Sequence, residues 1–212
     1  SMGELNKGAR RPKDVPPSTL KKVGVVGAGF MGASIAYVTA SAGIEVVLID
    51  RDQAAADKGK QVSYDLITKQ ITRGRAKTAD RDALLARIDA TPDYSKLSDC
   101  QLVVEAVFED RNVKAEVIKK VEAVLSRDAI FASNTSTLPI TSLAENFSRP
   151  DEFIGVHFFS PVDRMMLVEV ILGKKTGDKA LAVALDFVRA IKKTPIVVND
   201  SRGFFANRCV LN

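Results

Sequence analysis

A glycine-rich turn near the start of the chain constrains its fold more than any other feature. Residues 22–27, which are apolar after Lys22, predict a short buried strand, and residues 30–42 predict an alanine-rich helix. The first glycine of the turn allows a tight bend, the second a close approach to a pyrophosphate, and the third close packing of helix on strand. The helix start supplies N–H groups to an anion. The G-x-G-x-x-G pattern consists of Gly27, Gly29 and Gly32, with Phe30 and Met31 at the helix start.

An acidic residue ends the next apolar run. Residues 45–50 predict a second strand, and Asp50 follows Gly32 by 18 positions. A carboxylate there binds the ribose 2′-hydroxyl of NAD and repels the 2′-phosphate of NADP. Because Arg51 lies next to Asp50, NADP remains an alternative cofactor. The alternative to a dinucleotide site is a tight turn that binds no ligand. The sequence therefore favours a dinucleotide site.

Strand and helix patterns alternate as far as Pro150, which predicts an α/β protein with a Rossmann-like, doubly wound, mainly parallel sheet. After Pro150, two apolar runs are separated by only seven residues, too few for a helical crossover, so we expect an antiparallel pair. The expected strands are 88–90, 102–106, 129–133, 153–158, 166–172 and 194–198, and the expected helices are 53–73, 82–87, 111–126, 139–146 and 178–192.

The single histidine of the chain and one glutamate lie on this expected antiparallel pair. His157 and Glu169 are equally distant from Asp163, so a hairpin centred there places them face to face. A lone histidine on an apolar strand is commonly a core residue, but a charge on an apolar strand is costly unless it is paired. The carboxylate would fix the imidazole tautomer, as a general base requires.

Other polar residues follow the ends of neighbouring strands, where open α/β sheets bind ligands. Ser136 comes just after the strand at 129–133, and an ordinary polar loop that caps the next helix is the alternative reading. Glu109 and Lys114 follow the strand at 102–106, and from position alone each is expected to be a solvated charge.

Charge and composition exclude several classes of protein. The net charge is +5, but residues 1–22 contribute +4 of it, so the basic excess lies in a proline-containing tail and gives no nucleic-acid-binding groove. No apolar run reaches the ~18 residues of a membrane helix. Two distant cysteines, Cys100 and Cys209, and one histidine argue against a metal site and indicate a reducing compartment, the bacterial cytoplasm or alternatively a mitochondrial matrix.

Seven segments, taken together in order and spacing, resemble the NAD-binding domain of L-3-hydroxyacyl-CoA dehydrogenases over residues 21–212. Two of them, EAVFE and HFFSPV, are most like the multifunctional fatty-acid β-oxidation α-subunit. The segments are VGVVGAGFMG (23–32), EAVFE (105–109), FASNTS (131–136), HFFSPV (157–162), LVEVI (167–171), KTPIVV (193–198) and GFFANR (203–208).

The resemblance implies roles for individual residues. His157 would take the proton of the substrate 3-hydroxyl while hydride passes to NAD, Glu169 would orient it, and Ser136 and Asn207 would contact the acyl-CoA. Ser160 stands where free-standing enzymes usually have asparagine, and Arg202 where the family commonly has proline, a change without an interpretation. The cofactor contacts implied are Asp50, Glu109, Lys114, Asn134, Ser136 and Ser160, besides the glycine turn.

The resemblance also implies a domain organisation. Residues 1–20 would be a tag residue and flexible linker after a hydratase domain, 21–202 the NAD-binding domain, and 203–212 the start of a truncated helical domain. The helical domain would complete the acyl-CoA cleft and mediate dimerisation or assembly into a multienzyme complex. The 212-residue chain alone is therefore expected to bind NAD and to turn over substrate poorly.

Two other functions remain open at this stage. An NAD(P) dehydrogenase of a free hydroxy acid would need a basic residue near His157, and Arg164 is the candidate. A non-catalytic, crystallin-like relative would bind NAD without chemistry, which the joint presence of Ser136, His157, Glu169 and Asn207 argues against.

Overall fold

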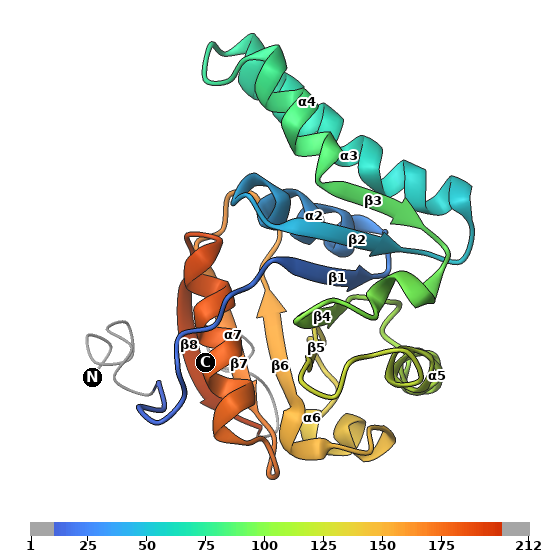
Figure 1. Cartoon of the computed structure of the whole chain (residues 1–212), viewed down its shortest axis with the longest axis vertical. Coiled ribbons are helices and arrows are strands. Elements are labelled where there is room, and N and C mark those ends of the chain that lie inside the picture. The colour runs from blue at the N-terminus through green and yellow to red at the C-terminus, as the bar shows by residue number, and fades with distance from the viewer. Residues whose placement is uncertain (1–10, 201–212) are drawn as a thin grey trace, which may run out of the picture.

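A computed structural model describes residues 11–200, and within them the strands form one eight-stranded sheet (Figure 1). The strand order is β3-β2-β1-β4-β5-β6-β7-β8, and its first six members have the order of a Rossmann fold. The strands are β1 (Lys22–Val26), β2 (Glu45–Ile49), β3 (Ile88–Thr91), β4 (Leu102–Glu105), β5 (Ile130–Ser133), β6 (Phe153–Phe158), β7 (Leu167–Leu172) and β8 (Thr194–Asn199).

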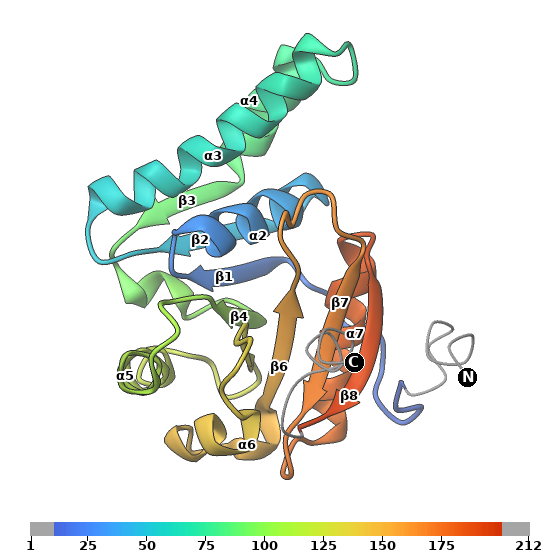
Figure 2. The same cartoon turned by 180° about the vertical axis from the view of Figure 1, so that it is seen from behind.

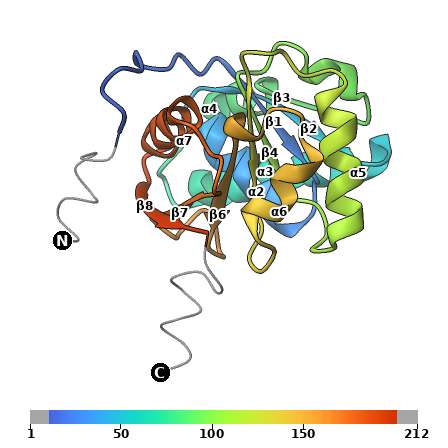
Figure 3. The ribbon, with the colours of Figure 1, turned by 90° about the horizontal axis from the view of Figure 1, so that it is seen from below.

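Helices cover both faces of this sheet. Helices α2, α3, α4 and α7 pack on one face, and α5 with α6 on the other (Figures 2 and 3). The α3–α4 pair extends away from the body beyond β3 (Figures 1 and 2). The α-helices are α2 (Phe30–Ser41), α3 (Gln53–Thr72), α4 (Thr78–Ala86), α5 (Arg111–Glu122), α6 (Ile140–Leu143) and α7 (Asp178–Ala190), with short 3₁₀ turns η1 (Tyr94–Leu97), η2 (Ala144–Asn146) and η3 (Pro150–Glu152).

The predicted α/β architecture is confirmed, including the antiparallel pair. Strands β1 to β6 pair in parallel, β6 pairs antiparallel with β7, and β7 pairs in parallel with β8 across the α7 crossover. His157 faces Glu169 in the register of β6 with β7, as the hairpin symmetry predicted. Because β6 runs parallel to β5, His157 lies near the same edge of the sheet where β1, β4 and β5 end.

Some boundaries differ from the sequence prediction. Helix α4 begins at Thr78 instead of residue 82, because the Asp80 carboxylate accepts a hydrogen bond from the Lys77 N–H at 2.8 Å and closes an earlier first turn. The helix predicted over 139–146 divides into α6 and η2, with Pro139 preceding α6 instead of lying in its first turn. The helix predicted over 111–126 ends at Glu122.

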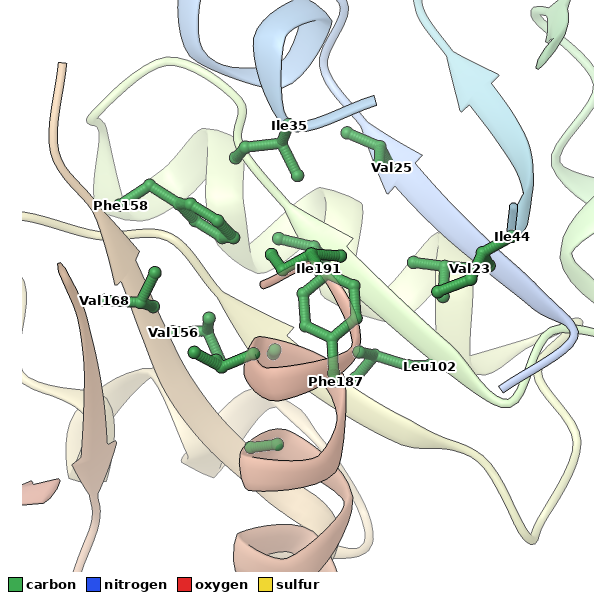
Figure 4. Packing of buried hydrophobic residues seen from close by; sticks show 14 of the residues in the cluster. Val23, Val25, Ile35, Ile44, Leu102, Val156, Phe158, Val168, Phe187 and Ile191 are labelled. Atoms are coloured by element: carbon green, nitrogen blue, oxygen red, sulfur yellow. The ribbon is translucent and has the colours of Figure 1, made fainter. Parts of the chain in front are cut away.

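Successive side chains of each strand point to opposite faces of the sheet, so the core consists of two layers. On the α7 face, the ring of Phe187 packs among Val23, Leu102 and Val156, and meets Phe158 edge-on with centroids 6.4 Å apart (Figure 4). The opposite face holds a second apolar cluster under α5 and α6. The polar side chains Glu105, Ser133, His157 and Glu169 alternate with residues of the α7 face, so they belong to the α5–α6 face.

The segment from Arg11 to Leu20 lies against the body beside α7. The Arg11 guanidinium binds both carboxylate oxygens of Asp186 at 2.9 Å and also donates to the carbonyl oxygens of Pro12, Val15 and Pro16. The Ser18 N–H donates to the same carboxylate at 3.0 Å, and Leu20 packs on the core. One aspartate of α7 therefore fixes the whole segment.

We expect Asp186→Asn to lower the melting temperature by about 2–4 °C at neutral pH, since a charge-assisted, partly exposed contact of this kind is worth about 1 kcal/mol. Although burial opposes it, hydrogen bonds from Arg11 and Ser18 lower the pKa of Asp186 below its ordinary value. A lowered folded-state pKa stabilises the fold above the unfolded pKa of about 3.9, and that stability is lost as the pH falls through the folded value.

Calorimetry from pH 7 to pH 3 should therefore show the gap between wild type and Asp186→Asn closing in acid. Asp82→Asn, an equal charge change at an exposed position of α4, is the control and should leave the melting temperature nearly unchanged. A difference in melting temperature that stays constant down to pH 3 would contradict this role of the Asp186 carboxylate.

Candidate active site

The glycine turn is held by close backbone packing. Gly27 has φ +101°, and a Cβ there would lie 2.7 Å from the carbonyl oxygen of Ala106. A Cβ on Gly32 would lie 1.6 Å from the carbonyl oxygen of Gly27, so the first turn of α2 requires glycine. At Gly29 nothing lies within 4 Å of the Cβ position. Packing thus requires the first and third glycines, and the second leaves the backbone open to a ligand.

A large cleft opens over this turn. It has a volume of about 1150 Å³ and runs from Asp50 at the end of β2, past Gly27 and Gly29, to Val107 after β4. Helix α2 starts at the cleft, with no side-chain cap and no acidic residue in its first turn, so its first N–H groups remain available to an anion. Size and backbone donors fit a dinucleotide.

Three residues predicted to contact the cofactor line this cleft in different ways. Asp50 accepts a hydrogen bond from the Ala28 N–H at 2.8 Å, which joins the end of β2 to the glycine turn. Phe30 is 75% exposed and Met31 is partly buried, and both line the cleft. Phe108, which the sequence analysis did not single out, is 78% exposed and lies in the same cleft. Two exposed rings thus border the site.

A smaller pocket of about 350 Å³ adjoins the cleft through Met31, Ala106 and Val107, which line both. Five residues predicted from the sequence come together in this pocket, from the ends of β4, β5 and β6: Glu109, Asn134, Ser136, His157 and Ser160. These five residues and Gly27, Gly29 and Asp50 therefore lie along one continuous groove at the carboxyl edge of the sheet.

His157 and Glu169 form the pair that the sequence predicts. The Nδ1 atom of His157 lies 3.3 Å from Oε1 of Glu169, whose side chain is fully buried, and the His157 side chain is 13% exposed. An ionised carboxylate at Glu169 could only accept a hydrogen bond, and with it the neutral ring would carry its proton on Nδ1 and present Nε2 as an acceptor. The ring of Phe159 meets the imidazole edge-on at 4.9 Å.

Ser136 is held in the pocket by Glu109. One oxygen of the Glu109 carboxylate accepts from the Ser136 N–H and Oγ, both at 2.8 Å, and the other accepts from Thr135 Oγ1 at 2.8 Å. Although partial burial opposes it, these hydrogen bonds and the charge of Lys114 lower the pKa of Glu109. Asn134 has a comparable local role, since its Oδ1 accepts the N–H of Phe158 at 2.8 Å.

Lys114 differs from its sequence prediction. It is fully buried instead of solvated, with Nζ 2.5 Å from Oε2 of Glu105 and 3.7 Å from Oε1 of Glu109. It lines neither pocket. The sequence analysis also missed Glu105 as a site residue, although a charge at the end of the apolar run LVVE is the same signal that pointed to Glu169.

Lysine also anchors the loop between β6 and β7. The buried Nζ of Lys193 donates to the carbonyl oxygens of Val162 at 2.6 Å and Met165 at 2.5 Å. Burial, only partly offset by Asp163, lowers the pKa of Lys193. This contact fixes the loop that carries Ser160. Asn207, the remaining predicted substrate contact, lies outside the described residues, as does Arg202.

Residues 11–200 offer no candidate for two other features, a metal centre and a membrane-spanning helix. No group of three or more His, Cys, Asp or Glu side chains in this range could hold a metal ion. No helix in the same range is long and apolar enough to cross a membrane. Cys100 is a buried free thiol, and its burial raises its pKa to about 12, so it is unreactive in the folded protein.

A sequence model described as the NAD binding domain of 3-hydroxyacyl-CoA dehydrogenase matches residues 22–201. The chain therefore belongs to the 3-hydroxyacyl-CoA dehydrogenase family, whose members are NAD-dependent oxidoreductases, and the matched region is the NAD-binding domain.

Solved structures agree with this assignment. The chain is 38% identical to (S)-3-hydroxybutyryl-CoA dehydrogenase from Ralstonia eutropha, with a TM-score of 0.88, covering 91% of this chain and 68% of that one. It is 30% identical to 3-hydroxybutyryl-CoA dehydrogenase from Escherichia coli, with a TM-score of 0.87, covering 90% of this chain and 40% of that one. It is also 30% identical to the dehydrogenase part of multifunctional enzyme 1 from C. elegans, with a TM-score of 0.79, covering 89% of this chain and 44% of that one. The chain thus spans well under half of the last two proteins.

We expect the protein to bind NADH more tightly than NADPH, because the Asp50 carboxylate repels a 2′-phosphate. Asp50→Asn should lower the ratio of the Kd for NADPH to the Kd for NADH at least tenfold (about 1.4 kcal/mol). A fluorescence titration of each nucleotide measures this, and the chain contains no tryptophan to overlap with the signal. Asp57→Asn, an equal charge change at an exposed position of α3 outside the cleft, is the control. An equal effect of both substitutions would contradict the role of Asp50.

Proposed function

We propose that the protein oxidises the 3-hydroxyl of an L-3-hydroxyacyl-CoA to the 3-oxoacyl-CoA with NAD, using His157 as general base and Glu169 as its partner. The observation that carries this proposal is the position of the His157–Glu169 pair in a pocket that adjoins the nucleotide cleft. Membership of a family of NAD-dependent dehydrogenases supports the reaction class.

In this proposal His157 Nε2 accepts the proton of the 3-hydroxyl as the O–H bond breaks. NAD, when bound in the cleft, would supply the acceptor for the hydride that leaves C3 as the C=O bond forms. Glu169 keeps the proton of the neutral ring on Nδ1 and stabilises the imidazolium that the transfer creates. Because Glu169 is fully buried, its interaction with that positive charge is screened little by solvent.

The remaining predicted residues position the reactants. Ser136, held by Glu109, and Asn207 are proposed to contact the acyl-CoA. Asp50 is proposed to bind the adenosine ribose, and the N–H groups at the start of α2 the pyrophosphate. The proposed contacts near the nicotinamide are Glu109, Asn134, Ser136 and Ser160, while the burial of Lys114 supports an indirect role for that residue.

The alternative of a free hydroxy acid as substrate has less support. Arg164, the candidate partner of a substrate carboxylate, is exposed on the β6–β7 loop and does not line the pocket that contains His157. No cation of the β6–β7 loop therefore lines this pocket to bind the carboxylate of a free hydroxy acid. This favours a thioester substrate.

We also propose the cellular setting that the sequence favoured. The segments EAVFE and HFFSPV support a place in fatty-acid β-oxidation as part of a multifunctional polypeptide, and similarity to the dehydrogenase part of a multifunctional enzyme agrees with it. Residues 1–20 would then be a linker, and 203–212 the start of a helical domain that takes part in dimer or complex formation. The proposed location is the bacterial cytoplasm, or alternatively a mitochondrial matrix.

His157→Gln in the full-length polypeptide tests the proposed base. We expect kcat for acetoacetyl-CoA reduction by NADH to fall about 10²–10⁴-fold, the usual contribution of a general acid or base, since the same group works in both directions. The Kd for NADH should change less than about threefold, because the Rossmann cleft is intact.

Arg164→Ala is the matched control and should leave kcat and KM for acetoacetyl-CoA unchanged. If His157→Gln retained wild-type kcat, the assignment of the base would be wrong. If the enzyme preferred acetoacetate and Arg164→Ala abolished that activity, the free hydroxy-acid dehydrogenase would replace the present proposal.

The tautomer of His157 can be tested on the 212-residue chain itself. His157 is the only histidine, so its ring ¹⁵N signals are assigned without ambiguity. We expect the neutral ring to carry its proton on Nδ1, and Glu169→Gln to reduce that preference because an amide can also donate to the ring. An Nε2–H tautomer in the wild-type protein would contradict the proposed base.

A further inference from the structure

A second buried charge pair lies below the pocket, on the same face of the sheet as His157 and Glu169. Glu105 at the end of β4 and Lys114 on α5 are both fully buried, and Lys114 Nζ lies 2.5 Å from Glu105 Oε2. Buried charges are costly unless they are paired and hydrogen-bonded. Neither residue lines the cleft or the pocket, so we expect any effect of the pair on the site to pass through neighbouring residues.

Glu105 binds to three different segments. Oε2 accepts from Lys114 Nζ and from the Val107 N–H at 2.9 Å, and Oε1 accepts from Ser133 Oγ at 2.6 Å. Its backbone carbonyl accepts the N–H of Asn134 at 2.8 Å. Glu105 and Ser133 are direct neighbours in the register of β4 with β5. One side chain therefore joins the end of β5, the turn after β4 and the first turns of α5.

These segments carry one wall of the pocket. Val107 lies in the turn after β4 and lines both the pocket and the cleft, while Asn134 and Ser136 follow β5 directly. Lys114 also contacts the Val107 carbonyl at 3.2 Å and lies 3.7 Å from Glu109, which holds Ser136. The chain of contacts thus runs from the buried pair through Glu109 to Ser136.

We propose that Glu105 is a positioning residue for the reaction, which sets Ser136 opposite His157 through Lys114 and Glu109 and through its bond to Ser133. This inference rests on the proposed function. The His157–Glu169 pair comes from the hairpin of β6 and β7, and the backbone pairing of β5 with β6 ends at Ser133 and Gly155. Glu105 therefore fixes the wall that carries Ser136 beyond the point where that pairing ends.

A double-mutant cycle with Ser136 tests the proposal in the full-length polypeptide. Glu105→Gln keeps the shape of the side chain and removes its charge. We expect it to lower kcat for acetoacetyl-CoA at least tenfold in the wild-type background and less than about threefold when Ser136 is already alanine, because coupled residues are non-additive. The Kd for NADH should change less than about threefold.

Two further variants keep the test decisive. Glu105→Gln combined with Lys114→Met removes both charges, so it should fold even if Glu105→Gln alone does not, and it should show the same loss of kcat. Glu45→Gln, the same change at the 65%-exposed start of β2, is the control and should leave kcat unchanged.

The outcomes separate this inference from the proposed function. Additive effects of Glu105→Gln and Ser136→Ala, or wild-type kcat in the folded double variant at 105 and 114, would overturn the positioning role. An equal loss of NADH affinity would also overturn it, since Glu105 would then act on the cofactor cleft. If His157→Gln retains activity, the proposed function itself fails, whatever the result at Glu105.

Discussion

A fully buried carboxylate on an apolar strand is unfavourable unless it is paired, and the site depends on the pairing of Glu169 with His157. Strand β7 is too apolar to supply a cation, and only the pairing of β6 with β7 brings His157 within 3.3 Å. A slip of β7 by one residue against β6 would move Glu169 to the opposite face of the sheet, which α7 covers, and away from His157. The position of the proposed base is therefore fixed by the same hydrogen bonds that build the sheet.

The same alternation explains why the other polar groups gather at one place. Glu105, Ser133, His157 and Glu169 share the α5–α6 face, while their neighbours along each strand fill the core under α7. The parallel strands β1, β4, β5 and β6 end at a common edge, so the glycine turn, the turn after β4 and the segment 134–136 meet there. Two side-chain pairs lie at the two walls of the pocket: His157 with Glu169 in the β6–β7 hairpin, and the buried ion pair of Glu105 with Lys114 between β4 and α5.

Much of this arrangement follows from the sequence alone. The G-x-G-x-x-G turn, the alternation of strands and helices, and the short connection between β6 and β7 were enough to predict the sheet and the facing of His157 and Glu169. The groove that joins the glycine turn to His157 follows from the strand order, because every contributing strand ends at one edge.

Apart from Glu169, the sequence did not reveal which charges are buried. Lys114 follows the Asp110 cap of α5 in a polar stretch, and nothing local distinguishes it from the neighbouring exposed lysines. Its burial depends on Glu105, nine positions earlier, and on the packing of α5 against β4. The anchoring of residues 11–20 is likewise non-local, since Arg11 finds Asp186 at a separation of 175 residues. Contacts across such distances are set by the completed fold.

If the nucleotide cleft and the His157 pocket form one site, the nicotinamide of bound NAD lies beside the imidazole. Because His157 is the only histidine, a nuclear Overhauser experiment on the NAD complex of the 212-residue chain tests this arrangement. We predict a cross-peak between the His157 ring protons and the C4 proton of the nicotinamide. Saturable NAD binding that leaves the His157 signals unshifted, with no such cross-peak, would contradict it.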